Sequence, residues 1–301
     1  MTTSLKASDR LDQRLPGSKP VVLSPIVHRA LGALSRAASG LPGSWRLRHF
    51  LRSTSRSAFP DKPIRTRLKF GQALWVLPND LIGRNIFCDG LWETPIAAHF
   101  YQNLRAGDVV LDIGANIGQY TVLAGSKVGP SGKVFAVEPS GLAEGLLLRN
   151  IRENRLTNVE ILQLAAWDED TTLFFKPGDK SNCGTAEVSK DPALSTSHQV
   201  IARRLDGVLE ERGIARLDVV KIDIEGAELP ALAGLTRTFE RLRPRAIYCE
   251  VLGTPSTGRA AELIRFFTSR GFQAAVIGQH GPARFDPGLY DGDGDLTLLF
   301  S

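Results

Sequence analysis

Three ionisable residues, Lys221, Asp223 and Glu225, alternate along the sequence directly after a Leu-Asp-Val-Val run. Successive side chains of a strand point to opposite faces of its sheet, so these three are expected on one face at the carboxyl end of a strand. Charged groups that leave a buried sheet are costly unless they bind something. We therefore predict a catalytic site in which Asp223 acts on the substrate as a hydrogen-bond acceptor or a base. The alternative is an ion pair of Lys221 with a carboxylate that only stabilises the strand end.

A second acidic residue, Glu250, lies near the end of the apolar run Ile247–Val251. It would come beside Asp223 if the two strands are neighbours, and the two carboxylates could then hold Mg²⁺ with water as further ligands. Two acidic strand ends are also common without a metal. The Asp-Gly-Asp-Gly-Asp run at 291–295 fails the EF-hand pattern, because Leu296 occupies the sixth position, where glycine is needed. We expect a turn there.

The segment Val109–Thr121 is typical of a buried strand, a turn of small residues and the start of a helix. Gly114 and Gly118 have no Cβ, so the turn can approach a ligand closely. The turn lacks the Gly-x-Gly-x-x-Gly spacing of a dinucleotide site, and Asp112 would repel phosphates. This combination favours a nucleoside with a cationic end, and we predict S-adenosylmethionine (SAM) as that ligand. An ordinary strand-to-helix turn is the alternative.

Glu138 ends the apolar run Lys133–Val137 and follows Gly118 by 20 residues. This is about the separation at which α/β nucleotide folds place a carboxylate on the ribose hydroxyls. Two carboxylate oxygens can accept both hydroxyl protons, so Glu138 is predicted to hold the ribose; a solvated strand-end cap is the alternative. Adenine is predicted near Ala165–Ala166, where small side chains leave room for a flat ring, with Asp168 accepting from its amine.

With these motifs, the chain resembles the FkbM-type methyltransferase family of Rossmann-like SAM-dependent enzymes over roughly residues 85–300. The resemblance rests also on the runs Gly90–Glu93, Ala165–Asp168, Ser181–Gly184, Arg204–Asp206 and Val220–Glu228, and on Asn150 and Asn154. It implies SAM as methyl donor and transfer to a hydroxyl group of a small molecule, glycan or secondary metabolite. The predicted cofactor site is Glu93, Asp112, Gly114, Asn116, Gly118, Tyr120, Glu138, Ala166 and Asp168.

Two other interpretations stay open. A nicotinamide-dependent oxidoreductase or epimerase of Rossmann type is opposed by the missing third glycine and by Asp112. A non-catalytic binding protein that keeps the SAM fold is the other. The sequence has no Asp/Asn-Pro-Pro-Tyr run of the kind found in many enzymes that methylate base nitrogens, so nucleic acid is disfavoured as the acceptor.

Strand and helix patterns alternate along the chain, which is the signature of a parallel sheet with helices on both faces. We predict a Rossmann-like, doubly wound α/β fold with a mostly parallel seven-stranded sheet, whose final antiparallel strand is implied by the resemblance. A hairpin is expected around Gly71-Gln72, before the core. Expected core strands are 108–113, 133–138, 159–164, 217–222, 245–251, 272–277 and 295–300, and expected helices are 94–104, 119–127, 141–154 and 260–270. Two further strands, 171–176 and 198–202, flank an irregular loop at 177–194.

Charge divides the chain of 301 residues into two parts. Residues 1–70 hold 14 Lys/Arg against 3 Asp/Glu, whereas the other residues hold 23 against 29. We predict a basic N-terminal extension at 1–60, disordered or helical, and a methyltransferase domain at 61–301. The apolar spacing at 25–41 fits a helix packed on the domain, or an amphipathic helix for an anionic membrane surface. Three distant cysteines predict no disulfide, and without a membrane span or signal peptide the expected location is cytoplasmic.

Overall fold

The computed structural model describes residues 59, 61–178, 182–191, 198–253, 258–278, 281–286 and 296–301. The predicted extension at 1–60, with its helix at 25–41, and the acidic run at 291–295 therefore fall almost wholly outside the described residues. None of the described helices combines the length and the apolar character that a membrane span requires.

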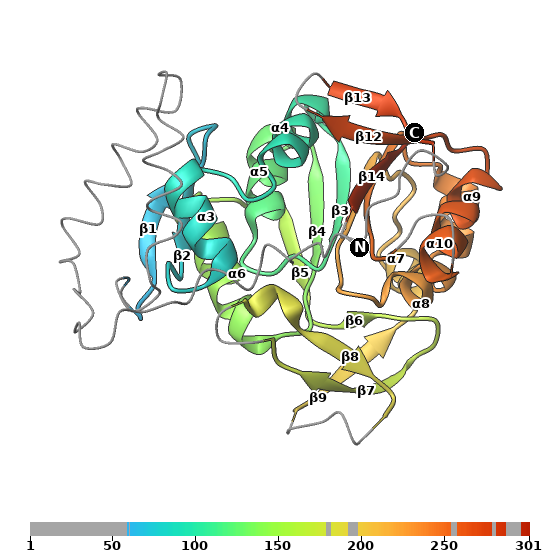
Figure 1. Ribbon diagram of the computed structural model, residues 1–301, viewed down its shortest axis with the longest axis horizontal. Helices are drawn as coiled ribbons and strands as arrows, with labels where there is room; N and C mark the ends of the chain where they lie inside the picture. The colour runs from blue at the N-terminus through green and yellow to red at the C-terminus, as the bar shows by residue number, and fades with distance from the viewer. Residues whose placement is uncertain are drawn as a thin grey trace, which may run out of the picture.

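An eight-stranded sheet with the order β13-β12-β14-β11-β10-β3-β4-β5 forms the centre of the molecule (Figure 1). Strands β3, β4, β5, β10 and β11 are parallel, and β14 is antiparallel to both of its neighbours, β11 and β12. The strands are β3 (Val109–Ile113), β4 (Lys133–Val137), β5 (Val159–Leu162), β10 (Val219–Ile222), β11 (Ala246–Val251), β12 (Ala274–Gly278), β13 (Gly281–Arg284) and β14 (Leu296–Phe300). The doubly wound fold is confirmed; the sheet has eight strands instead of seven because β13 pairs with β12 at the edge.

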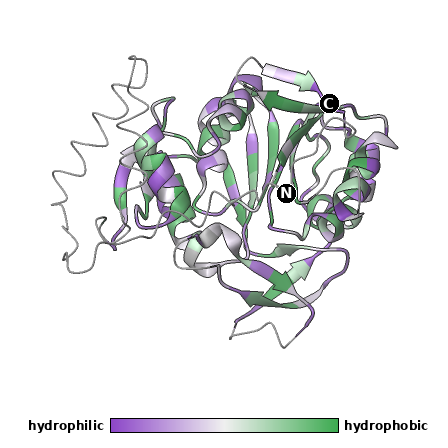
Figure 2. Ribbon diagram, in the orientation of Figure 1, coloured by the Kyte–Doolittle hydropathy of each residue, from purple (hydrophilic) through white to green (hydrophobic). Residues whose placement is uncertain are grey.

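Helices cover both faces of this sheet, as the apolar strands require. Leu111 of β3 packs with α7, α8, α9 and α10, whereas its neighbour Val110 packs with α3, α4 and α5, because successive side chains point to opposite faces. Figure 2 shows the hydrophobic residues along the central strands. The helices are α3 (Leu81–Asp89), α4 (Thr94–Asn103), α5 (Gln119–Val128), α6 (Gly141–Glu153), α7 (Leu205–Glu211), α8 (Glu228–Ala233), α9 (Thr236–Leu242) and α10 (Gly258–Thr268).

The predicted hairpin is present as β1 (Ile64–Arg67) and β2 (Ala73–Val76), and it packs on α6. Two amide side chains of α6 fix it there. Asn150 accepts from the Trp75 backbone N–H at 2.6 Å and donates to its carbonyl at 3.1 Å, and Asn154 makes the same pair of bonds with Ala73. These two asparagines of the family resemblance thus join the hairpin to the core.

A second sheet of four strands, in the order β6-β9-β7-β8, lies beside the carboxyl ends of the large sheet (Figure 1). It consists of β6 (Ala165–Ala166), β7 (Thr171–Lys176), β8 (Glu187–Ser189) and β9 (His198–Arg203), with a short 3₁₀ helix, η4 (Cys183–Thr185), ahead of β8. The sequence predicted β7 and β9 as strands but not their assembly into a separate sheet.

Candidate active site

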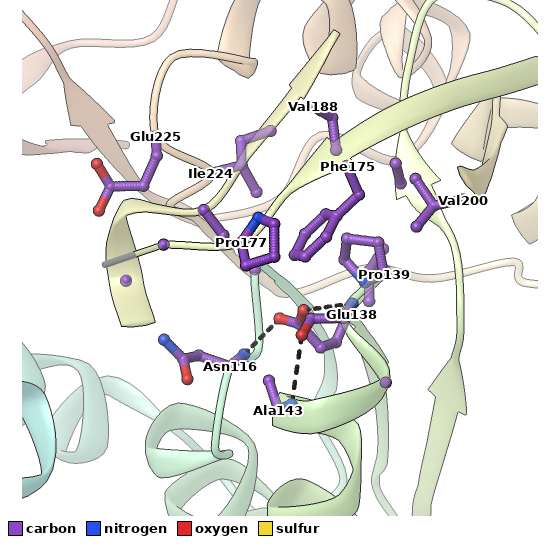
Figure 3. A pocket seen from close by; sticks show the side chains of 18 of the residues that line it. Asn116, Glu138, Pro139, Ala143, Phe175, Pro177, Val188, Val200, Ile224 and Glu225 are labelled. Atoms are coloured by element: carbon purple, nitrogen blue, oxygen red, sulfur yellow. Dashed lines mark hydrogen bonds between the residues drawn. The ribbon is translucent and has the colours of Figure 1, made fainter. Parts of the chain in front are cut away.

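A cavity of about 710 Å³ opens where the strand order reverses, at the carboxyl ends of β3, β4 and β10. Ligands of open α/β sheets bind at this switch point, and cavities for small ligands commonly measure about 300–1,000 Å³. Gly114, Glu138 and Asp223 extend these three strands and line one side of the cavity. Figure 3 shows Glu138 among the side chains of the lining. Phe175 and Val200 of the second sheet line another.

The glycine turn after β3 is held tightly against the end of β10. Gly114 has φ of +82°, and a Cβ there would overlap the Asp223 carbonyl. If Gly114 served only the approach of a ligand, Gly114→Val would still fold. The backbone angle and the contact both forbid a side chain, so the glycine is required by the turn itself. Asn116 also has a positive φ, +48°, and its side chain lies at the cavity (Figure 3). Gly118, at φ +90°, begins α5 and does not line the cavity.

Glu138 is fixed at the cavity by backbone donors. Its Oε2 accepts from the Asn116 N–H and its Oε1 from the Ser140 N–H, both at 2.8 Å. The residue is only 7% exposed, and burial raises the pKa of its carboxyl to about 7 despite these two bonds. Each oxygen keeps a further lone pair, so the carboxylate can accept from a ligand as well.

Asp112 precedes Ile113, the last residue of β3, and unlike Ile113 it does not line the cavity. It is 1% exposed, and burial raises the pKa of its carboxyl to about 6. Its Oδ2 accepts from Thr121 Oγ1 at 2.5 Å, whereas its Oδ1 has no hydrogen-bond partner among the residues that the structure describes. A buried carboxylate oxygen without a donor beneath a ligand turn favours a positively charged or donating group nearby.

Lys221 and Asp223 form the ion pair considered above as an alternative. Lys221 Nζ donates to Asp223 Oδ2 at 2.8 Å and lies 4.9 Å from the centre of the Tyr120 ring. Burial alone would lower the pKa of Lys221, but the carboxylates of Asp223 and Glu93 raise it above its ordinary value. Burial in turn raises the pKa of Asp223, and the Lys221 charge outweighs this and lowers it. Asp223 lines the cavity and Lys221 does not, so the pair does not exclude a ligand role for Asp223.

Glu228 clamps the loop that carries Asp223 and Glu225. Its Oε1 accepts from the Gly226 N–H at 3.0 Å and from the Ile224 N–H at 3.4 Å, and the side chain is buried. Between these two residues Glu225 takes φ of +51°, which is uncommon for a residue with a side chain. We had not assigned Glu228 to the site; an acid in the first turn of a helix directly after a glycine bend was the available signal.

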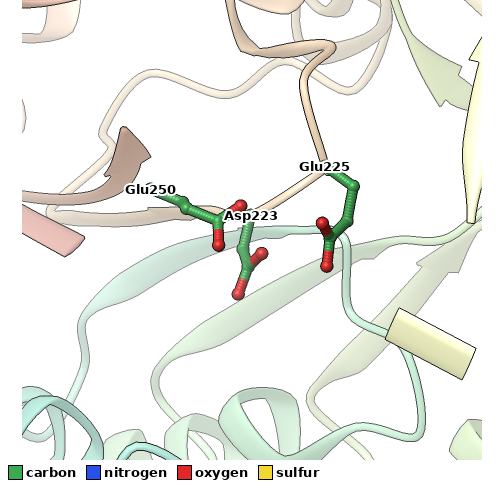
Figure 4. Close-up of side chains that lie close together, drawn as sticks. All are labelled: Asp223, Glu225 and Glu250. Atoms are coloured by element: carbon green, nitrogen blue, oxygen red, sulfur yellow. The ribbon is translucent and has the colours of Figure 1, made fainter. Parts of the chain in front are cut away.

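Three carboxylates converge beside the cavity (Figure 4). Because β10 and β11 pair in parallel, Glu250 comes beside Asp223 as expected, and Glu225 joins them. One oxygen of each lies within 4.8 Å of the others. Glu250 Oε2 is buried without a hydrogen-bond partner in the described part of the chain. Burial, and then the charges of Asp223 and Glu225, raise the pKa of Glu250 well above its ordinary value. Such a group holds a shared proton or a cation.

Glu93 and Tyr120 lie behind this group, outside the cavity lining. Tyr120 Oη donates to Glu93 Oε2 at 2.9 Å, and Thr297 Oγ1 donates to Glu93 Oε1 at 3.2 Å. Burial raises the pKa of Tyr120, so its phenol stays protonated. The two residues surround the Lys221 ammonium and line no part of the cavity.

The structure brings Ala166 but not Asp168 to the cavity. The Asp168 backbone carbonyl accepts from Arg204 Nη1 at 2.5 Å, and Asp168 Oδ1 has no hydrogen-bond partner among the described residues. Arg204 and Asp206, two residues of the family resemblance, bond to other parts of the fold and not to the cavity. Asp206 is fully buried and accepts from the Thr238 N–H at 2.8 Å, at the start of α9.

The predicted loop at 177–194 supplies Val188 to the apolar wall of the cavity, whereas Phe175 and Val200, which complete this wall from the second sheet, were not predicted as part of it. His198 lies on the same lining. His99, by contrast, lies outside the lining and contacts Tyr248 Oη at 2.9 Å through its Nδ1, as expected of a packed residue.

Fold and cavity together define an α/β protein with a ligand site at the switch point of its sheet. Residues 112–274 match the methyltransferase FkbM domain, and the chain belongs to this family. It is 30% identical over 207 residues to the 31-O-demethyl-FK506 methyltransferase FkbM of Streptomyces tacrolimicus, covering 60% of this chain and 77% of that protein.

Other relatives are more distant or much longer. The chain is 28% identical over 149 residues to the hexuronic acid methyltransferase AglP of Haloferax volcanii, covering 49% of this chain and 58% of that protein. It is 27% identical over 205 residues to the AMB antimetabolite synthetase AmbE of Pseudomonas aeruginosa, covering 56% of this chain and only 10% of that protein. Among solved structures, M. jannaschii TYW2 in complex with AdoMet aligns with a TM-score of 0.42 at 14% identity, over 80% of this chain and 85% of that one. A likeness of this size carries no argument about function.

Proposed function

We propose that this protein is a SAM-dependent O-methyltransferase that acts on a hydroxyl group of a small molecule or sugar. The observation that carries the proposal is the cavity at the switch point, where Glu138 lies beside the Gly114 turn and accepts from the Asn116 N–H of that turn. Membership of the FkbM family supports methyl transfer. The names of two relatives support an oxygen acceptor on a small molecule in one case and a sugar acid as substrate in the other.

The residues of the cavity fit the cofactor. Glu138 would accept from both ribose hydroxyls, because its two oxygens keep lone pairs beside the bonds to Asn116 and Ser140. Adenine would lie against Ala165 and Ala166, and the methionine end would lie at the glycine turn. The acidic surroundings there suit an ammonium and a sulfonium. Glu93, Tyr120, Gly118 and Asp168 would support the site from outside its lining.

Asp223 would act on the acceptor. When bound, SAM supplies a methyl group that is already activated on sulfur, so the protein must align the acceptor oxygen and help to remove its proton. The Lys221 charge keeps Asp223 ionised, which makes it a hydrogen-bond acceptor that orients the hydroxyl. Glu225 would give a second acceptor on the same lining.

Mg²⁺ is a second element of the proposal, supported by the convergence of Asp223, Glu225 and Glu250. Bound there, the ion would lower the pKa of a coordinated hydroxyl. If the ion is required, EDTA abolishes turnover and Mg²⁺ restores it. If the carboxylates instead share a proton, EDTA leaves turnover unchanged.

Calorimetry tests the proposal against its alternatives. We expect S-adenosylhomocysteine (SAH), the product of SAM, to bind with 1:1 stoichiometry and NAD not to bind. Tight NAD binding without SAH binding would favour the oxidoreductase or epimerase instead. SAH binding without SAH release from SAM, over a panel of sugar and polyketide alcohols, would favour the non-catalytic binding protein. The cytoplasmic location, and membrane contact through the basic residues 1–60, stay predictions.

A further inference from the structure

The cavity is unusually poor in positive charge. Among the described residues that line it, four are carboxylic acids, Asp80, Glu138, Asp223 and Glu225, and none is lysine or arginine. Asp80 is occupied as the cap of α3, where it accepts from the Gly83 N–H at 2.9 Å. The other three carboxylates lie on the side that we assign to the cofactor and to the acceptor hydroxyl. His198 also belongs to the lining and is exposed to solvent, where electrostatic interactions are screened.

Three lysines that lie within two residues of the lining in the sequence are bound to acids. Lys221 is 1% exposed and donates to Asp223 from behind the lining. On the second sheet, Lys176 of β7 pairs with Glu187 of β8 at 3.5 Å. Lys190, directly after β8, pairs with Glu169 at 2.6 Å. Neither lysine lines the cavity. In the described part of the chain, an anionic group inside the cavity would therefore meet carboxylates and no cation.

The part of the cavity between Glu138 and Glu225 is apolar. Pro177 and Ile224 lie between these two carboxylates in Figure 3, with Phe175 and Val188 beside them. A surface of this kind binds an apolar body, while Asp223 and Glu225 accept hydrogen bonds from hydroxyl groups at its end. An anion there would lose its hydration and would be repelled by Asp223 and Glu225. A divalent cation bound by the three ionised carboxylates would not make this site positively charged, so it would not attract an anion.

We propose, resting on the methyltransferase function above, that the acceptor is an uncharged hydroxyl compound with an apolar body and that acceptors bearing carboxylate or phosphate are rejected. The proposal therefore favours a neutral alcohol with an apolar body over a hexuronic acid, which is the substrate class that one relative's name gives. The selection arises from the carboxylates, which repel an anion, and from the lack of lysine and arginine among the described residues of the lining; this is discrimination against a wrong partner.

Two ligands that differ only in charge test the proposal. Hexyl β-D-glucuronide carries a carboxylate, and hexyl β-D-glucuronamide has nearly the same shape without charge. We expect the full chain, titrated by calorimetry at pH 8 with and without saturating SAH, to bind the amide at least tenfold more tightly. Equal or tighter binding of the glucuronide overturns the proposal, and so does binding of neither, because the apolar subsite would then be absent.

Matched variants place the selection at the cavity wall. Val188→Lys should shift the preference toward the glucuronide by at least tenfold, whereas Val188→Met, of similar length and without charge, should leave it unchanged. An unshifted preference in a folded Val188→Lys protein contradicts the assignment of this wall. Titration of SAH alone tests the methyltransferase function separately from the acceptor preference. Failure of SAH to bind overturns the methyltransferase function. SAH binding together with a preference for the glucuronide overturns only the proposal that the acceptor is uncharged.

Discussion

Replacement of Glu138 by alanine should weaken SAH binding by about 2–4 kcal/mol, or roughly 30- to 1,000-fold. Two hydrogen bonds from ribose hydroxyls to an ionised acceptor would be lost. The Asn116 and Ser140 N–H groups, which Glu138 now satisfies at 2.8 Å each, would also lose their partner. Glu138→Gln should lie between the two proteins, because its single amide oxygen can accept from only part of this set.

Isothermal calorimetry with SAH measures the effect at pH 8, where the carboxyl is ionised even with its pKa raised to about 7. Glu144→Ala is the matched control, because it removes the same charge one turn into α6 from a residue outside the cavity lining. Circular dichroism confirms that each variant is folded. Unchanged SAH affinity in a folded Glu138→Ala protein would refute the assignment of Glu138 to the ribose.

Four further predictions follow from the same geometry. Asp223→Asn should keep SAH affinity and lower turnover by about 10²–10⁴, since its amide oxygen still accepts from Lys221 but cannot take a proton; full turnover in the variant would reduce Asp223 to a structural residue. Glu228→Ala should lower turnover at least about tenfold and Glu228→Gln should restore much of it, because the amide oxygen can still hold the Gly226 N–H; equal losses in both would contradict the clamp. Gly114→Ala should lower the thermal midpoint by several degrees, whereas Gly141→Ala, on the same lining but with open space at its Cβ, should not; a stable Gly114→Ala protein would contradict the packing of the turn. The folded state should become more stable as the pH falls from about 8 to about 6, because the raised pKa of Glu138 lets the folded chain bind a proton that the unfolded chain does not bind. In thermal melts, Glu138→Gln should show a smaller gain in stability over this pH range. Burial lowers the pKa of His99, which opposes the gain, but it does so equally in both proteins.

The order of strands and helices was predictable because each core element has a clear apolar period. The alternation of apolar strands and helices from 108 to 251 requires a parallel sheet, and the carboxyl ends of its strands bring Asp223, Glu138 and the glycine turn to one edge. Even the proximity of Glu250 to Asp223 could be expected from two neighbouring acidic strand ends.

Contacts between distant segments were beyond local patterns. Nothing in the spacing of Gly114 shows that the Asp223 carbonyl occupies the place of its Cβ. The amphipathic alternation that marks β7 and β9 as strands does not tell which sheet a strand joins. The cavity wall of Phe175 and Val200 therefore could not be predicted, nor could the charge of the cavity as a whole.

Asp112 and Asp168 show a second limit of local patterns. A residue near the end of a strand can face the ligand or lie one residue short of it. The alternation of side chains along a strand does not by itself tell which of the two holds. Asp112 is buried beneath the turn, although the next residue, Ile113, lines the cavity. Asp168 lies outside the lining, two residues after Ala166, which belongs to it.

A crystal structure of the full chain with SAH tests the central claim most directly. We predict SAH in the cavity at the carboxyl ends of β3 and β4, with both ribose hydroxyls within about 3.2 Å of the Glu138 carboxylate and the homocysteine end at the Gly114 turn. SAH bound elsewhere, or with its ribose away from Glu138, would contradict the account.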